Sequence, residues 1–456
     1  MPDSLFYICL IKNYMRKNLY TILISVTLLI LICIFIFAKK PKKTVPPFKD
    51  RTGTIALSAE WLDTKKAIQN LLANIEANPK DYKSMLALAQ AYIQESRVTG
   101  NHAYYDKAAL EVLNTVLENE SKNFEALCCK ATVLLSQHHF AEGLEIAKIA
   151  QPINPDNAFI YGVMCDANVE LGKYDEAVKM ADKMISIRPD NRSYARVSYL
   201  REIYGDMPGA IQAIKLAVAA GYPGLEQTVW TRNILAHLYE NIGSIDSAEM
   251  QYNMSLQERP NYAFAIAGLG RMAKDKGNYK EAITDYEKAK GMISEYSFSD
   301  ELTDLYRLNN EPDKANKNAE DVIKMLSPNS DVEGESGHGH YADKELAYAY
   351  LKINDTENAL KHALIEYDRR PDNIDVCETV AWIRYKNGDF AEANKLMNKA
   401  LKTHSKNPIL LCRAGLIKIK AGEAEKGKAL IKQAVETNPF LDIELKKEAI
   451  PYLVLK

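Results

Sequence analysis

Apolar residues recur every three or four positions from Ile55 to the end of the chain, in segments of about a dozen residues. This spacing is that of one face of an α-helix. Short polar breaks separate the segments, and four of them read NPKD, NPDN, RPDN and RPNY. Proline with Asn or Asp ends one helix and begins the next. The pattern therefore predicts an all-α chain of many short helices.

The breaks recur at a fixed interval. Pro155 and Pro189 are 34 residues apart, and Pro371 and Pro439 are 68 apart, which is twice that interval. Small residues that follow short turns keep the same period, with successive gaps of 35, 34, 33, 38, 34, 33, 44, 34 and 34 residues. They are Ala108, Gly143, Ala177, Ala210, Ala248, Ala282, Ala315, Ala359, Ala393 and Gly427. We therefore expect about ten repeated units.

Each unit contains two helices that cross closely. In most units another small residue stands twelve positions earlier, in the preceding helix, as at Ala131, Ala236 and Gly415. Only a small side chain lets two helix backbones approach at such a crossing. An aromatic residue commonly stands three positions before the second small residue, as at Tyr279, where it can wedge between neighbouring helices.

A 34-residue helix-turn-helix unit with these small, aromatic and proline positions resembles the tetratricopeptide repeat family. The stretch FAIAGLGRMAKDKGNYKEAITDYEKA, residues 264–289, carries the family pattern most fully, with Gly270, Gly277, Ala282 and Tyr286. The resemblance implies a right-handed superhelical solenoid of about ten such repeats. No unit has the family's preferred Trp at the start of its first helix.

One segment breaks the helical period. Residues 19–38 contain no charge and are flanked by lysine and arginine, which predicts one N-terminal transmembrane helix. A cleavable signal peptide is the competing interpretation, although its apolar core is usually shorter. The expected organisation is a basic segment at 1–18, the anchor at 19–38, a basic proline-rich tether at 39–54, a capping helix or partial repeat at 55–79, the repeat array at 80–440 and a C-terminal capping helix at 441–456.

The side of the membrane on which the repeats lie is open. More basic residues follow the anchor than precede it, which favours a cytosolic array. A lone N-terminal anchor preceded by basic residues is also typical of export, and bacterial proteins often have this arrangement. We expect an extracytoplasmic, periplasmic-side array, with the cytosolic alternative open. The cysteines do not decide between the two sides, because they form no CxxC pair.

Composition and motifs point away from nucleic acid binding and from catalysis. The chain has 58 basic and 60 acidic residues, so it lacks the basic excess that nucleic acid requires. The sequence contains no GxSxG, HExxH or GxxxxGK[ST] motif. Two histidine pairs, His138 with His139 and His338 with His340, are too few for a zinc site. We therefore expect no enzyme, no cofactor and no metal.

Candidate binding residues come from the concave face, which in this family is lined by the first helix of each unit. Directly after the small residue of those helices stand Gln90, Thr132, Asp166, Tyr199, His237, Arg271, Asp304, Tyr348, Trp382 and Leu416. The predicted partner-binding groove consists of Tyr199, Asn233, His237, Arg271, Arg307, Lys344, Tyr348, Trp382 and Tyr385. Such residues can hold a peptide through stacking, hydrogen bonds and charge.

The sequence therefore predicts a non-enzymatic scaffold, tethered to a membrane, that binds a protein or peptide in its concave groove. The alternative is a docking or regulatory subunit of an envelope enzyme or secretion complex whose catalysis lies in another chain. Self-association of the arrays is compatible with either hypothesis.

Overall fold

The computed structural model describes residues 27–28, 45–327 and 340–454. One compact unit begins at Pro47 and contains all the helices discussed below. The expected anchor at 19–38 lies outside the described residues except for Thr27 and Leu28. Among the helices that the structure does describe, none has the length and apolarity needed to cross a membrane. The anchor therefore stays a prediction.

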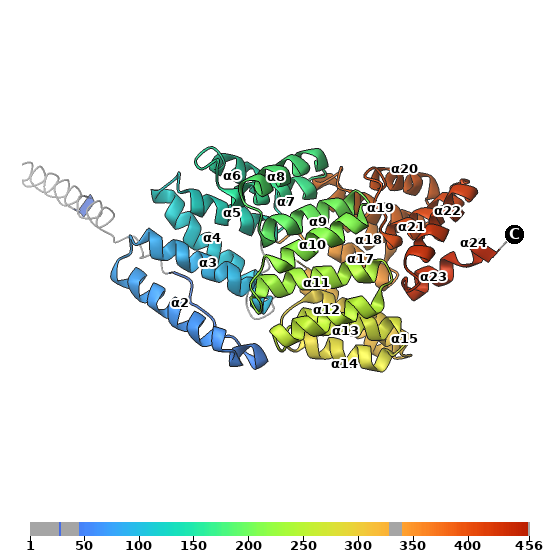
Figure 1. The fold of residues 1–456 in the computed structure, drawn as a ribbon, viewed down its shortest axis with the longest axis horizontal. Helices are drawn as coiled ribbons and strands as arrows, with labels where there is room; N and C mark the ends of the chain where they lie inside the picture. Colours follow the sequence, from blue (N-terminus) through green and yellow to red (C-terminus); the bar gives the residue numbers. More distant parts are fainter. Residues whose placement is uncertain (1–26, 29–44, 328–339, 455–456) are drawn as a thin grey trace, which may run out of the picture. The chain divides into compact units, whose positions relative to one another are not determined.

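The described residues from Tyr82 to Thr437 form ten helix pairs and no strand (Figure 1). The first helices of the pairs are α3 (Tyr82–Thr99), α5 (Phe124–Ser136), α7 (Ala158–Glu170), α9 (Asn191–Ile203), α11 (Glu226–Asn241), α13 (Ala263–Asp275), α15 (Tyr296–Leu308), α17 (Asp343–Lys352), α19 (Ile374–Lys386) and α21 (Pro408–Lys420). The second helices are α4 (His102–Asn119), α6 (Phe140–Ala150), α8 (Tyr174–Ile187), α10 (Met207–Ala219), α12 (Ile245–Glu258), α14 (Tyr279–Lys290), α16 (Pro312–Leu326), α18 (Thr356–Arg369), α20 (Phe390–Ala400) and α22 (Ala424–Thr437). The predicted all-α solenoid of helix pairs is confirmed, and its hand stays a prediction.

The small residues lie where the two helices of a pair cross. Ala131, Ala236 and Ala381 on first helices have no exposed surface, and neither have Ala248 and Ala393 on second helices. In the last pair the two backbones approach closely, since a Cβ on Gly427 would lie 2.5 Å from the carbonyl oxygen of Gly415. Close packing at these crossings explains why the sequence repeats small side chains there.

Every turn inside a pair contains one residue with positive φ. Seven of these residues are glycines, and the others are His138, Asn310 and Asn354. From the second pair onward, the amide just past the turn donates to a carbonyl five residues back, as Lys173 does to Asn168. This is the Schellman termination, which requires one left-handed residue. His138 therefore has a structural role as a turn residue.

The chain before the first pair packs against the array. Phe48 stacks on Trp61 and Tyr92, with ring centroids 5.6 and 6.2 Å apart. The guanidinium of Arg51, which is 5% exposed, donates to the fully buried carboxylate of Glu95 at 2.6 and 2.8 Å. Residues 47–52 of the expected tether are thus held in place, ahead of η1 (Gly53–Leu57) and α2 (Ala59–Ala77). At the other end, α23 (Ile443–Ala449) and α24 (Pro451–Val454) follow the tenth pair.

The solenoid returns to contact itself after about 200 residues. The phenolic oxygen of Tyr174 accepts from the amide of Ile374 at 2.9 Å, and the amide of Asn438 donates to the Glu240 carbonyl at 3.1 Å. These partners are 200 and 198 residues apart. One turn of the solenoid therefore takes about six units of the 34-residue period. We call this set of contacts the seam.

Candidate functional site: the inner hollow

The first helices of the first five pairs line a hollow of about 960 Å³ that is partly open to solvent. Helices α3, α5, α7, α9 and α11 form its wall, and Lys344, Glu345 and Arg370 from the next turn of the solenoid also line it. Both turns of the solenoid therefore contribute side chains to the wall. We take this hollow as the candidate site.

The register of the small residues determines which side chains reach the hollow. Thr132 and Asp166, directly after the small positions of α5 and α7, line it as the repeat pattern predicts. Seven residues earlier on the same faces, Glu125 and Phe159 line it too. Two helical turns separate positions seven apart, so they share a face. The wall of the hollow therefore consists of rows that repeat from helix to helix.

The predicted groove residues do not include the earlier of these two rows. Seven residues before Tyr199 stands Arg192, and seven before His237 stands Trp230, and both line the hollow. Trp230 is 38% exposed, which is unusual for so large an apolar side chain. The signal that would have found both residues is the heptad spacing from the position after each small residue.

Several charges in the hollow, but not all, are paired within the chain. Arg196 donates to the Asp166 carboxylate at 2.8 and 2.5 Å. Arg370 pairs with Glu366 at 2.5 Å and with Glu170 across the seam. Burial raises the pKa of Glu170, although Arg370 and Lys344 oppose that effect. The side chains in these ion pairs are already engaged and are less able to bind charged groups of a partner.

Two cations are exceptions. Arg192 forms no ion pair with any described carboxylate, and it donates only to the side-chain oxygen of Gln227 at 3.3 Å. Burial and the neighbouring Arg196 lower the pKa of Arg192. For Lys344, burial also lowers the pKa, but the carboxylates of Asp375, Glu345 and Glu170 outweigh it and the pKa is raised. Arg192 is therefore the cation most available to an incoming anionic group.

The structure divides the nine predicted groove residues into three groups. Lys344 alone lines the hollow described above. Tyr199 on α9 and His237 on α11 are exposed to solvent outside the hollow, and Tyr199 is 43% exposed. Burial and the carboxylates of Asp375, Glu170 and Glu202 nevertheless raise the pKa of Tyr199 well above its usual range.

A second group is partly exposed and already bonded within the chain. Arg271 donates to Glu240 at 3.0 Å and to the phenolic oxygen of Tyr252 at 2.7 Å. The Tyr348 oxygen accepts from Arg413 at 3.0 Å. Arg307 donates to the backbone carbonyl of Lys352 at 2.5 Å. A partner would have to compete with these contacts, and the binding role of this group stays a prediction.

The third group is buried. Asn233 is 7% exposed and accepts from the Ser255 hydroxyl at 2.8 Å. Trp382 and Tyr385 are both 6% exposed and stack on each other with centroids 5.0 Å apart, and the Tyr385 hydroxyl donates to Glu448 at 2.7 Å. These three side chains hold the pairs together and offer a partner little surface.

The histidines and cysteines give no sign of a metal centre in the part of the chain that the structure covers. No group of three or more His, Cys, Asp and Glu side chains there is placed to hold a metal ion. The His138 ring lies 4.4 Å from that of His340, and burial lowers the pKa of both rings to about 4. His338 lies outside the described residues. Burial raises the pKa of the Cys128 thiol, on the wall of the hollow, to about 12.

Fold and site together define an α-helical repeat protein with a hollow on its inner surface. A family model described as tetratricopeptide repeat matches residues 265–296, which cover most of α13 and all of α14. This match supports the resemblance to tetratricopeptide repeat proteins, and it is a match to a repeat family rather than to an enzyme family.

Known proteins with similar chains carry the same kind of repeat. The TPR repeat-containing protein MJ1428 of Methanocaldococcus jannaschii is 22% identical over 402 residues, covering 85% of this chain. The chain spans only 61% of the length of that relative. Among solved structures, a tetratricopeptide repeat protein from Parabacteroides merdae is 16% identical, covering 54% of this chain and 93% of its own, with a TM-score of 0.41. The human IFIT1 dimer with PPP-AAAA is 15% identical, covering 81% and 90%, with a TM-score of 0.45.

Proposed function

We propose that this chain is a non-enzymatic scaffold that holds an extended segment of a partner protein in the inner hollow. The observation that carries the proposal is the hollow itself, which has about 960 Å³ of space and walls drawn from five consecutive first helices. A space of that size fits a few residues of an extended peptide and excludes a folded domain.

The chemistry of the wall suits a peptide. Phe159 and Trp230 provide aromatic surface, and aromatic side chains are enriched among the residues that dominate binding energy. Arg192 adds a guanidinium without a carboxylate partner, which can bind a carboxylate or a backbone carbonyl of the peptide. We therefore propose that the partner segment has an apolar side chain close to an acidic one.

The scaffold is proposed to act at a membrane, because the sequence of residues 19–38 has the length and apolarity of a spanning helix. With the anchor preceding the array, the hollow would present the bound segment near the membrane surface. We propose an extracytoplasmic array, and the support for that side is the position of the anchor alone.

Crosslinking in cells tests the binding site. Benzoylphenylalanine at Trp230, on the wall of the hollow, should crosslink a discrete partner, whereas the same residue at Tyr222, which is 77% exposed outside it, should not. Arg192→Glu should abolish the Trp230 crosslink while leaving the circular dichroism spectrum unchanged. Equal labelling from both positions, or none from Trp230, would contradict the proposal. Protease accessibility of the array in spheroplasts reports its side of the membrane.

A further inference from the structure

Four side chains form a row across the wall of the hollow, one from each of four successive first helices. Glu125, Phe159 and Arg192 are the second residues of α5, α7 and α9, and Trp230 follows on α11. Each stands seven residues before the position that follows the small residue of its helix. Successive first helices contact one another, so the four positions follow one another along the wall. We call these four residues the inner row.

The inner row alternates charged groups with aromatic surface. Its first residue is an exposed carboxylate, Glu125, and its third is an exposed guanidinium, Arg192. Phe159 stands between them, and the Arg192 guanidinium lies over its ring, 5.5 Å from the ring centroid. A cation–π contact of this kind holds the guanidinium in place without neutralising its charge. The row therefore offers a partner a negative, an apolar, a positive and, at Trp230, a second apolar position.

The carboxylate of the inner row has no partner within the described chain. Two other carboxylates of the wall, Asp166 and Glu170, are paired with arginines, whereas Glu125 forms no ion pair or side-chain hydrogen bond with any described residue. Glu345 is also unpaired there, but one of its two carboxylate oxygens is buried and out of a ligand's reach. Glu125 is therefore the carboxylate of the wall most available to a cationic group.

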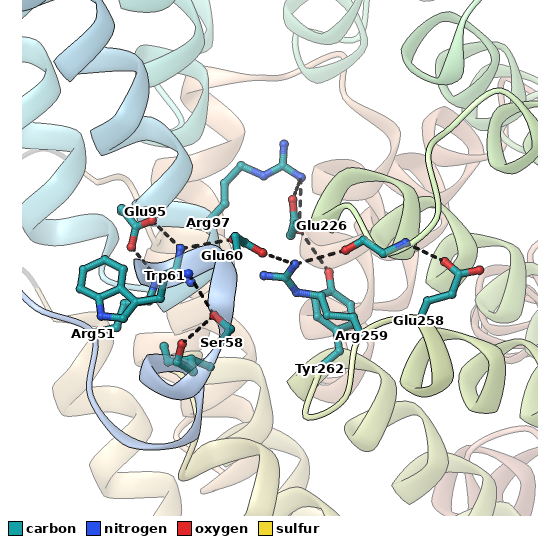
Figure 2. A network of polar contacts seen from close by, with 12 residues as sticks. Arg51, Ser58, Glu60, Trp61, Glu95, Arg97, Glu226, Glu258, Arg259 and Tyr262 are labelled. Atoms are coloured by element: carbon teal, nitrogen blue, oxygen red, sulfur yellow. Dashed lines mark hydrogen bonds and ion pairs between the residues drawn. The ribbon is translucent and has the colours of Figure 1, made fainter. Parts of the chain in front are cut away.

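A second arginine of the wall, Arg97, differs from Arg192 in being already engaged, as Figure 2 shows. Arg97 pairs with the Glu226 carboxylate at 3.1 Å, and Glu226 also accepts from the Tyr262 hydroxyl at 3.2 Å. The next residue, Gln227, accepts from Arg192 at 3.3 Å. Since the side chain of Gln227 is a neutral amide, it positions the guanidinium and leaves its charge uncompensated. Arg192 is therefore the cationic position of the row.

The spacing of the helices determines the distance between the two free charges. Helices that pack together lie about 8–10 Å apart, axis to axis. Glu125 on α5 and Arg192 on α9 are separated by α7, so their positions along the row lie about 16–20 Å apart. An extended chain advances about 3.3 Å per residue. A segment lying along the row therefore passes from one charge to the other in about five or six residues.

From this order of positions we infer that the hollow selects an extended segment whose basic and acidic residues stand about five or six positions apart, with an apolar residue between them. The basic residue faces Glu125, the acidic residue faces Arg192, and the apolar residue packs on Phe159. The inference rests on the proposed function and adds to it the sequence that the partner segment carries. Opposite charges across an interface select the partner and its register, because like charges brought together cost free energy.

Selection from a peptide library tests this inference on the purified full chain. Phage display about twelve random residues, enough to cross the four helices of the row in an extended conformation. Enriched peptides are then synthesised, and those that crosslink to benzoylphenylalanine at Trp230 are counted. They should carry a basic and an acidic residue about five or six positions apart more often than the unselected library does. Crosslinked peptides without such a pair would overturn the inference and uphold peptide binding, whereas no crosslinked peptide at all would refute the proposed function as well.

Charge reversal at Glu125 gives the sharper measurement. A selected peptide should bind Glu125→Lys at least about tenfold more weakly than it binds the parent, because its basic residue then faces a lysine. The same peptide with glutamate in place of that basic residue should show the opposite preference. Equal affinities of the parent and the variant for both peptides would overturn the inference.

Glu357→Lys is the matched control for this reversal. Glu125 and Glu357 are both exposed acids in the first turn of a helix, so reversal costs each helix a similar interaction with its dipole, but only Glu125 lines the hollow. Glu357→Lys should leave both affinities unchanged. Should Glu125→Lys lose its helical signal in circular dichroism, Glu125→Gln replaces it. That variant should select peptides without a preferred basic residue, and an unchanged preference would count against the inference.

Discussion

At the scale of single residues, some ionisable side chains have shifted pKa values because protein atoms surround them on several sides. Asp275, the last residue of α13, is the clearest case. Burial and the nearby carboxylate of Glu240 raise the pKa of Asp275 to about 7, against the opposing effects of Lys274 and Arg271. The folded chain therefore keeps a proton on this carboxyl that the unfolded chain loses near pH 4.

The sign of the resulting pH dependence follows directly. Between about pH 4 and pH 7 the folded state binds more protons at Asp275 than the unfolded state, so this residue lowers stability as pH rises. Asp275→Asn removes the effect, and should stabilise the protein by about 1–2 kcal/mol at pH 8 and hardly at all at pH 4.5. Thermal unfolding at the two pH values measures this, with the exposed Asp182→Asn as control. An equal gain at both pH values would contradict the assignment.

At the scale of elements, close crossing of two helices limits the size of side chains more strictly than burial alone. In the last pair, Gly415 and Gly427 face each other, and a Cβ on either would lie within 2.6 Å of the other's carbonyl oxygen. Neither residue has positive φ, so neither is required by the backbone conformation. The constraint on this pair of glycines is purely one of distance between helices.

Gly427→Ala should therefore separate α21 from α22 and destabilise the protein by about 1–3 kcal/mol. Gly291→Ala is the control, because Gly291 ends α14 with a φ of −72° and its Cβ would make ordinary contacts at 3.5 and 3.6 Å. It should be neutral or slightly stabilising, since alanine restricts the unfolded chain. Urea unfolding of both variants gives the comparison. Equal stability of the two variants would show that the crossing can relax.

The same spacing explains how much the sequence could predict. The series of small residues from Ala108 to Gly427 predicted the ten pairs. Each of them marks a contact between two helices whose small residues are about twelve positions apart, and so short a separation shows in the local sequence pattern. The groove residues were predicted less well. Trp382 lies directly after its small residue, as Thr132 does, yet it is buried against Tyr385. The same register position faces the hollow in one pair and a neighbouring helix in another.

At the scale of the whole molecule, closure of the solenoid could not be predicted from any local pattern. Tyr174 occupies the aromatic position that the repeat predicts, but its hydroxyl also accepts from the amide of Ile374, 200 residues away. That amide begins α19, where helix N–H groups lack partners in their own helix. The repeat pattern explains why an aromatic ring stands at position 174. Only the contact between the two turns of the solenoid explains why that ring has a hydroxyl group.

Tyr174→Phe should consequently act at a distance. It leaves the buried amide of Ile374 without its acceptor, which costs about 1–3 kcal/mol locally. Hydrogen exchange in residues 370–376 should accelerate although the change lies in α8. Tyr204→Phe is the matched control, because the Tyr204 hydroxyl donates to Asp175, only 29 residues away, and the residue is 40% exposed. Faster exchange confined to α8 in Tyr174→Phe would mean that the two turns of the solenoid are not coupled in solution.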